Sequence, residues 1–211
     1  MRIKILTLTF IFCLTVQVHG QEEKSQLVWG CRLGLNYSSV RGSNSQGYDI
    51  KTGGTIGIFS RIKLSEIISL QPEFNYTSKG MSQETVIDDN PYEFTLAFTY
   101  LETPLLIKYN FGTDLHSGFK PDIFFGPFGA FKINSEITLV DDITGNSIDI
   151  ANVSGFDWGI AFGGSAGFPV DNVDVFLELR FTYSIPSYDN SSPSADLRHT
   201  VFTLSLGFAV N

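Results

Sequence analysis

The chain has 211 residues, 14% of them aromatic, and a formal net charge of −8 at pH 7. The acidic balance argues against a nucleic-acid partner, and the length suits one domain. After the first 20 residues the sequence contains one cysteine, Cys31, which excludes an intramolecular disulfide. No later stretch has the roughly 18 consecutive apolar residues of a transmembrane helix.

The N-terminus has the pattern of a secretory signal. Arg2 and Lys4 give it a positive start, and residues 5–16 are apolar but too short to span a bilayer as a helix. Small or tolerated residues at positions 18–20 precede the expected cleavage. We therefore predict a signal peptide over residues 1–20 and one β-barrel domain over residues 21–211.

The first half of the exported chain contains four segments in which apolar and polar residues alternate with the period of a strand. They are residues 27–37, 54–64, 68–79 and 94–109. In the fourth segment the alternation changes phase near Tyr100, which predicts a β-bulge there. Three prolines inside predicted strands point to further bulges, and they are Pro72, Pro104 and Pro127.

The second half contains four more such segments, at residues 122–134, 156–168, 172–184 and 197–210. The third of these has the clearest pattern. One of its faces is apolar and ends at a tyrosine, with Val173, Val175, Leu177, Leu179, Phe181 and Tyr183. The opposite face carries Asp174, Phe176, Glu178, Arg180 and Thr182.

The connections between the eight predicted strands alternate in length. Residues 38–52, 80–93, 135–155 and 185–196 are predicted as long polar loops, and the connections after the even-numbered strands are shorter. Bacterial outer-membrane barrels have short periplasmic turns, long extracellular loops and an even number of strands. The fold class predicted is therefore all-β, an eight-stranded antiparallel up-and-down transmembrane β-barrel.

The charged residues in the strands all fall opposite the apolar faces. The interior of an eight-stranded barrel is just filled by side chains, so the many Phe, Leu and Ile residues of the apolar faces fit only on the outside. The charged residues then line the lumen and must pair with one another. The predicted lumen charge network is Arg32, Arg61, Glu73, Glu102, Lys108, Glu178 and Arg180. A proton or ion pathway is the alternative for such charges.

Amphipathic aromatic residues fall near both ends of the apolar faces, where interfacial girdles lie in membrane barrels. The predicted lipid-interface residues are Trp29, Tyr37, Tyr76, Tyr109, Trp158 and Tyr183.

Five segments carry a resemblance to a known family: Tyr-Leu-Glu-Thr-Pro-Leu-Leu-Ile-Lys-Tyr at 100–109, Gly-Leu-Asn-Tyr-Ser at 34–38, residues 71–80, Gly-Pro-Phe-Gly at 126–129 and Glu-Leu-Arg-Phe at 178–181. They resemble the PorT-like outer-membrane β-barrel proteins of Bacteroidetes. The resemblance implies an outer-membrane location. The family's name-giving member is linked to a protein-secretion system.

Few residues suggest chemistry. Ser184 or Ser187 could act as a nucleophile with His199 as its base, as in a lipid hydrolase. The sequence around these residues contains no motif with the spacing of a hydrolase. His116 falls in a predicted periplasmic connection. The paired carboxylates Asp88–Asp89 and Asp141–Asp142 are expected to be solvated loop charge, with calcium or a divalent bridge to lipopolysaccharide as the alternative.

We therefore expect a non-enzymatic, monomeric outer-membrane barrel with a filled lumen, no cofactor and no metal. We expect a structural role, or an interaction role carried by the extracellular loops, with a link to protein secretion. The expected partners are outer-membrane lipids and a protein that the sequence does not identify. Two alternatives remain: a soluble periplasmic barrel that binds a small apolar ligand, and an outer-membrane lipid hydrolase.

Overall fold

The computed structural model describes residues 27–42, 49–87, 90–111, 118–140, 146–149, 154–187 and 197–210, so the predicted signal peptide lies outside the described residues. The regular structure of this part is entirely strand. The strands are β1 (Leu27–Arg41), β2 (Asp49–Lys63), β3 (Ile68–Ile87), β4 (Asn90–Asn110), β5 (Lys120–Val140), β6 (Asn146–Asp149), β7 (Phe156–Val170), β8 (Val173–Ser184) and β9 (Arg198–Val210). No helix in the described part is long and apolar enough to cross a membrane.

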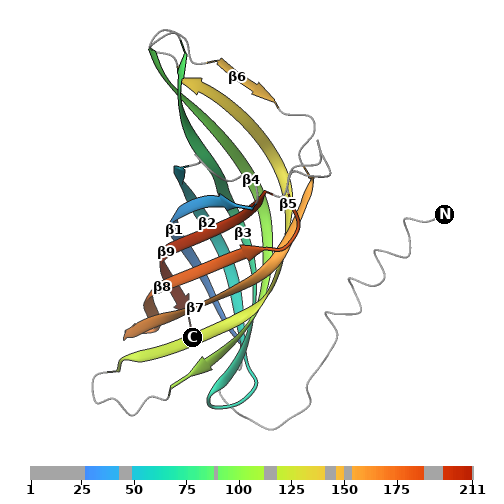
Figure 1. The fold of residues 1–211 in the computed structure, drawn as a ribbon. Coiled ribbons are helices and arrows are strands. Elements are labelled where there is room, and N and C mark those ends of the chain that lie inside the picture. The colour runs from blue at the N-terminus through green and yellow to red at the C-terminus, as the bar shows by residue number, and fades with distance from the viewer. Residues whose placement is uncertain are drawn as a thin grey trace, which may run out of the picture.

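Eight of these strands close into an antiparallel barrel (Figure 1). Each barrel strand pairs with the next along the chain, and β1 closes the ring by pairing with β9 from Trp29–Val210 to Arg41–Arg198. The short strand β6 pairs only with the end of β5. The predicted eight-stranded up-and-down barrel is confirmed.

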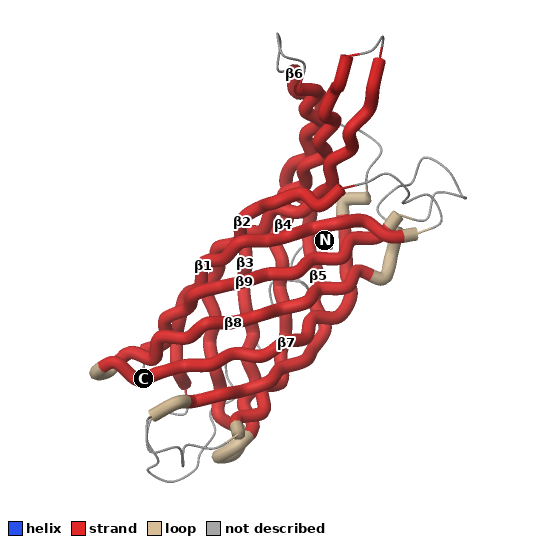
Figure 2. Tube along the Cα trace, turned by 60° about the vertical axis from the view of Figure 1, so that its left-hand side comes forward, coloured by secondary structure: helices blue, strands red, loops and turns tan. Residues whose placement is uncertain are grey.

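Strands β3, β4 and β5 continue beyond the rest of the barrel as a curved sheet extension, with β6 beside it (Figure 2). The β3–β4 ladder runs without a shift to the pair Ile87–Asn90. The predicted long loop over residues 80–93 is therefore wrong for most of its length. Alternation marks a strand only where its two faces have different surroundings, and a strand that leaves the barrel loses that contrast.

The bulge predicted near Tyr100 lies at the right place in the sheet, but on the facing strand β5 and not on β4. Leu96, Phe98 and Tyr100 are buried inside the barrel, so β4 keeps one phase throughout. The β4–β5 register shifts beside Thr99, and the extra residue is Ile133 in β5. The sequence prediction failed because the inward face of β4 is apolar towards the extension, and an apolar inward face has the same pattern as an apolar outward face.

None of the three strand prolines lies at a register shift. The β3–β4 register is the same at the pair Pro72–Leu105 and beyond it at Asn75–Glu102. Pro104 pairs with Phe128 in an equally regular part of the β4–β5 ladder, and the β5–β7 ladder passes Pro127 without a shift. The predicted bulges at these prolines are wrong.

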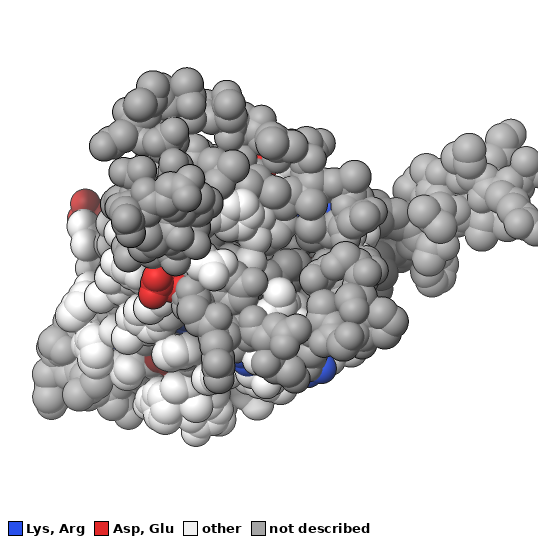
Figure 3. All heavy atoms as spheres, turned by 45° about the horizontal axis from the view of Figure 1, so that its top comes forward, with Lys and Arg blue, Asp and Glu red and all other residues white. Residues whose placement is uncertain are grey.

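The outward side chains of the barrel form an apolar belt, whereas inward Lys79, Lys108 and Arg180 are at most 1% exposed. In Figure 3 the visible described surface is mostly uncharged, with Lys, Arg, Asp and Glu as isolated groups. Exposed members of the belt include Leu33, Leu35, Ile56, Ile58, Phe74, Leu105, Ile107, Phe125, Phe162, Leu177, Leu179, Leu204 and Leu206. This distribution is typical of a barrel surrounded by lipid.

Leu179→Arg tests whether lipid surrounds the belt. Leu179 is 47% exposed in the middle of β8, and a charge at the bilayer midplane costs about 2–4 kcal/mol. Val170→Arg, at the end of β7, is the control and is expected to cost about 0–1 kcal/mol. Urea unfolding in phosphatidylcholine vesicles measures both. In a barrel surrounded by water the two substitutions would be equally harmless.

Candidate functional site: the closed lumen

Two arginines and two glutamates meet in the middle of the lumen. Arg180 of β8 donates to both carboxylate oxygens of Glu73 in β3, at 2.7 and 2.8 Å, and through Nε to Glu178 at 3.0 Å. Arg32 of β1 donates to Glu178 at 2.9 Å and lies 3.3 Å from Glu73. Since β1, β3 and β8 are not neighbours in the sheet, these ion pairs cross the lumen. We call these four residues the central ring.

Neutral side chains complete the hydrogen bonding of the ring. Gln71 and Asn75, which flank Glu73 on the inward face of β3, donate to its two carboxylate oxygens at 2.8 and 3.0 Å. Asn75 also accepts a hydrogen bond from Arg32 at 3.3 Å. Arg61 contributes indirectly, because it donates to the Gln71 side chain at 3.1 Å. A buried charge is tolerated only when it is paired and hydrogen-bonded in this way.

A second charge cluster lies towards the sheet extension. Lys79 of β3 contacts Glu102 of β4 at 2.7 Å and Asp157 of β7 at 3.5 Å, so it also bridges strands that are not neighbours. Ser184 of β8 donates to Asp157 at 2.7 Å. The rings of Tyr100 and Phe128 lie 5.3 and 4.7 Å from the Lys79 ammonium, within the range of cation–π attraction.

A third cluster lies at the end of the barrel that carries the short turns. Lys108 of β4 pairs with Asp122 of β5 at 2.9 Å, and Ser165 of β7 donates to the same carboxylate at 2.7 Å. Nearer the mouth, Lys120 pairs with Asp174 at 2.8 Å, with the lysine side chain 38% exposed. The charges of the lumen are thus arranged in three layers along its axis.

Aromatic rings fill the space between these layers by packing over glycines. A Cβ atom on Gly30 would lie 2.2 Å from the Phe59 ring, and one on Gly207 would lie 2.1 Å from the Phe176 ring. Phe59 and Phe176 contact each other edge to face at 5.7 Å between centroids. The inward glycines therefore provide the room that a narrow barrel needs to hold large side chains.

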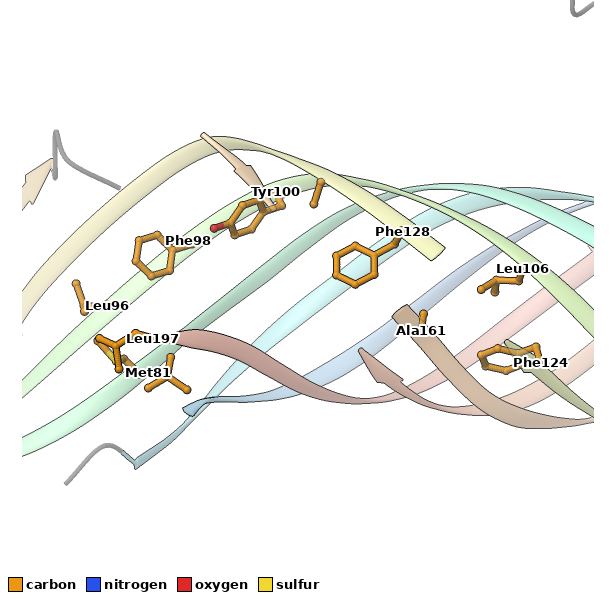
Figure 4. Close-up of a cluster of buried hydrophobic side chains, with 11 residues drawn as sticks. Met81, Leu96, Phe98, Tyr100, Leu106, Phe124, Phe128, Ala161 and Leu197 are labelled. Carbon is orange, nitrogen blue, oxygen red and sulfur yellow. The ribbon is translucent and has the colours of Figure 1, made fainter. Parts of the chain in front are cut away.

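An apolar cluster lines the lumen from the extension to Phe124, whose ring lies 5.1 Å from Arg180 of the central ring (Figure 4). In that view Met81, Leu96 and Leu197 gather at one end of the cluster, and Leu106 and Phe124 lie at the other. At the short-turn end, Val28 and Ala209 join Phe59 and Phe176 in a smaller buried cluster. Apolar contacts therefore lie on both sides of the central ring.

The remaining charged residues on the polar faces of the strands differ in burial. Lys63 ends β2 and is exposed, and Lys132 is half-buried at the bulge in β5, so neither belongs to the packed interior. Glu102 is buried in the second charge cluster and Lys108 in the third. Arg61 lies within 6 Å of the Phe59 and Phe176 rings, at 5.8 and 5.9 Å.

The six predicted interface aromatics all point outward from the barrel. Their exposed fractions range from 40% for Tyr37 to 59% for Trp29. The others are Tyr76, Tyr109, Trp158 and Tyr183.

The residues considered for hydrolysis have other partners. The Ser184 hydroxyl donates to Asp157, and His199 is 1% exposed with the rings of Phe98 and Tyr100 at 5.4 and 6.1 Å. Ser187 donates to the Leu197 carbonyl at 3.2 Å. His116, Asp88–Asp89 and Asp141–Asp142 lie outside the described residues. Within the described ranges no group of three or more His, Cys, Asp or Glu side chains could hold a metal ion.

Sequence reasoning did not identify the amides of the lumen as part of the site. Asn36 donates to the Thr77 hydroxyl at 2.9 Å and accepts from Thr203 at 2.8 Å, which links β1 to strands on both sides of it. Asn36, Gln71 and Asn75 each alternate along their strands with apolar residues that point outward. This alternation places the three amides inside the lumen, and it could have identified them from the sequence.

Arg180→Met tests the central ring. Removing the guanidinium leaves Glu73 and Glu178 short of their counter-charge, which should lower the free energy of unfolding by about 3–5 kcal/mol. The double variant Arg180→Met with Glu73→Gln should lose less free energy of unfolding than the two single variants lose together. Lys120→Met removes an ion pair at the mouth and should cost less than about 1 kcal/mol. Equal, small effects in urea titrations would contradict the assigned role of the ring.

Comparison with known proteins agrees with this architecture. A major outer membrane protein from Thermus thermophilus superimposes with a TM-score of 0.54 at 12% sequence identity, covering 87% of this chain and 98% of that one. OprG from Pseudomonas aeruginosa superimposes with a TM-score of 0.50 at 13% identity, covering 87% and 93%. At these identities the likeness shows the fold alone.

No match was found among curated protein sequences. The profile of a family described as "Outer membrane protein beta-barrel domain" matches residues 19–190, which is most of the chain. The apolar belt, the closed sheet and this match agree on an outer-membrane location. The chain belongs to the outer membrane protein β-barrel domain family.

Proposed function

We propose that the protein is a non-conducting outer-membrane barrel with a structural or interaction role, and that its lumen is a plug rather than a pathway. The observation that carries this proposal is the central ring, in which Arg180–Glu73 and Arg32–Glu178 cross the lumen between strands that are not neighbours. Ions or solutes would have to separate these buried pairs to pass.

The packing on either side of the ring supports the same proposal. A cavity of about 40 Å³ at the short-turn mouth is lined by Arg61, Lys120, Asp122 and Asp174, among others. Since one ordered water needs roughly 10–15 Å³, this cavity holds a few waters and no larger solute. A barrel that binds a small apolar ligand would need a larger, apolar internal cavity.

The sheet extension supports an interaction role. The β3–β4 hairpin and the end of β5 run beyond the barrel on the side of the long connections, which is the cell exterior in proteins of this type (Figure 2). Strand edges offer backbone donors and acceptors to an extended segment of another protein. The resemblance to PorT-like barrels makes a component of a protein-secretion system the partner that we propose. The barrel itself acts as a monomer held by outer-membrane lipids.

Planar-bilayer recordings test the plug. We expect the purified wild-type barrel to show no steady conductance, because the central ring leaves no continuous water path. The double variant Glu73→Ala with Arg180→Ala removes one of the two pairs that cross the lumen and should admit ions if the variant stays folded. A steady open-channel current from the wild type would contradict the proposal.

A shortened hairpin tests the extension. Replacing residues 84–93 by Asn-Gly joins the cross-strand partners Gln83 and Phe94 through a two-residue turn. The barrel should still resist SDS until boiled, since the change lies beyond its rim. Chemical crosslinking in native membranes should lose a product that the full chain gives. An unchanged crosslinking pattern would mean that the extension does not carry the interaction.

A further inference from the structure

The cavity at the short-turn mouth has an arginine on one wall and two carboxylates on the others. Arg61 comes from β2, whereas Lys120 and Asp122 come from β5 and Asp174 comes from β8, and β2 is a neighbour of neither strand. The cavity measures about 40 Å³ and lies at the end that faces the periplasm in barrels of this type. The rest of its lining is Asn110, Ser165, Gly167 and Phe176.

The two carboxylates that line the cavity already have cationic partners. Lys108 lies 2.9 Å from one oxygen of Asp122, and Ser165 donates to the other oxygen at 2.7 Å. Lys120 donates to both oxygens of Asp174, at 2.8 and 3.0 Å. Each carboxylate is therefore matched by one lysine, and neither is left as a partner for the arginine.

Arg61 has no counter-charge among the described residues. No carboxylate of that part of the chain lies within 4 Å of it, although each arginine of the central ring contacts two. The Arg61 Nε donates to the Gln71 side chain at 3.1 Å, and this is its one hydrogen bond to a described residue. A guanidinium has five N–H donors, so the four on the terminal nitrogens have no acceptor there.

The mouth therefore has more positive charge than its carboxylates balance. Arg61, Lys108 and Lys120 are three cations, and they face the two carboxylates described above. The Arg61 guanidinium and the Lys108 ammonium also share one aromatic neighbour, because they lie 5.9 and 5.7 Å from the centroid of the Phe176 ring. Cations held this close in partly desolvated surroundings repel each other, and an anion in the cavity offsets that repulsion.

We propose that this cavity binds one small inorganic anion with the size and charge of chloride, held by the terminal N–H groups of Arg61. Asn110 and Lys120 line the same space and add an amide and an ammonium donor. One ordered water needs roughly 10–15 Å³, so the cavity accommodates a monatomic anion beside a water and excludes a lipid headgroup. An anion suits the site better than water alone, because the unbalanced charge is positive and the unused groups of Arg61 only donate.

The site goes beyond the role of a plug, because it couples the stability of the barrel to an anion that the periplasm supplies. A ligand that binds only the folded state stabilises it by mass action. Salt that merely screens charges weakens ion pairs instead. Chloride is therefore expected to stabilise this barrel more than a bulky anion does at the same ionic strength.

Broadening of the chlorine NMR signal of sodium chloride measures the binding. The purified barrel in zwitterionic detergent is added at an ionic strength kept constant with sodium gluconate. We expect the wild type to broaden the signal several-fold more than Arg61→Gln, which loses the charge and the donors. Lys63→Gln is the matched control, because it removes one positive charge from the exposed end of the same strand and should keep the wild-type broadening.

Gly167→Ala tests the cavity without changing any charge. Its new methyl group enters the lining, 3.3 Å from the Cβ atom of Phe176, and should reduce the broadening. Resistance to SDS before boiling checks that each variant is folded, and Gly167→Ala against Lys63→Gln decides the matter if Arg61→Gln does not fold. The wild type should also melt at a temperature a few degrees higher in chloride than in gluconate.

Two results would overturn the proposal. Broadening that is the same for the wild type, Arg61→Gln and Gly167→Ala would show that the cavity binds no anion. A loss of broadening in Lys63→Gln as large as in Arg61→Gln would assign the effect to the general positive charge of the mouth. Equal melting temperatures of the wild type in chloride and gluconate would contradict the expected coupling to stability.

Discussion

A sheet that crosses a bilayer must satisfy its own backbone, because hydrocarbon offers no hydrogen-bond partners. The β1–β9 ladder meets this requirement by closing the ring from Trp29–Val210 to Arg41–Arg198. Closure with only eight strands fixes a lumen that side chains alone can fill. Every inward residue is therefore placed in a space that excludes most water, and the composition of that face decides whether the barrel is stable.

The inward face meets this constraint with both charge signs. A lone arginine in the lumen would cost several kcal/mol, but Arg32 and Arg180 each contact both Glu73 and Glu178, so the central ring has no net charge. Amides and aromatic rings fill the remaining space. The outward face carries the apolar surface that a soluble protein would bury, and lipid takes the role that a hydrophobic core has in water.

The sequence predicted the strands and their faces well, and the contacts between strands poorly. Alternation identified β8 and placed Glu178 and Arg180 opposite the apolar residues, because one side of that strand meets lipid. Through the phase change predicted near Tyr100 it placed Phe98 outside the barrel, because an apolar residue inside the lumen resembles one outside. It also could not show that Glu73 meets Arg180, because contacts across a barrel depend on the strand register, which only the closed sheet fixes.

The exchange of the Arg180 Nε proton with water tests the closed lumen most directly, since this group donates to Glu178 at 3.0 Å in the central ring. NMR of the barrel in lipid nanodiscs would measure it. A dry, paired lumen predicts a resolved Arg180 Nε–H signal that exchanges far more slowly than that of an exposed arginine. Exchange as fast as in free arginine would show that water reaches the ring and would contradict the account.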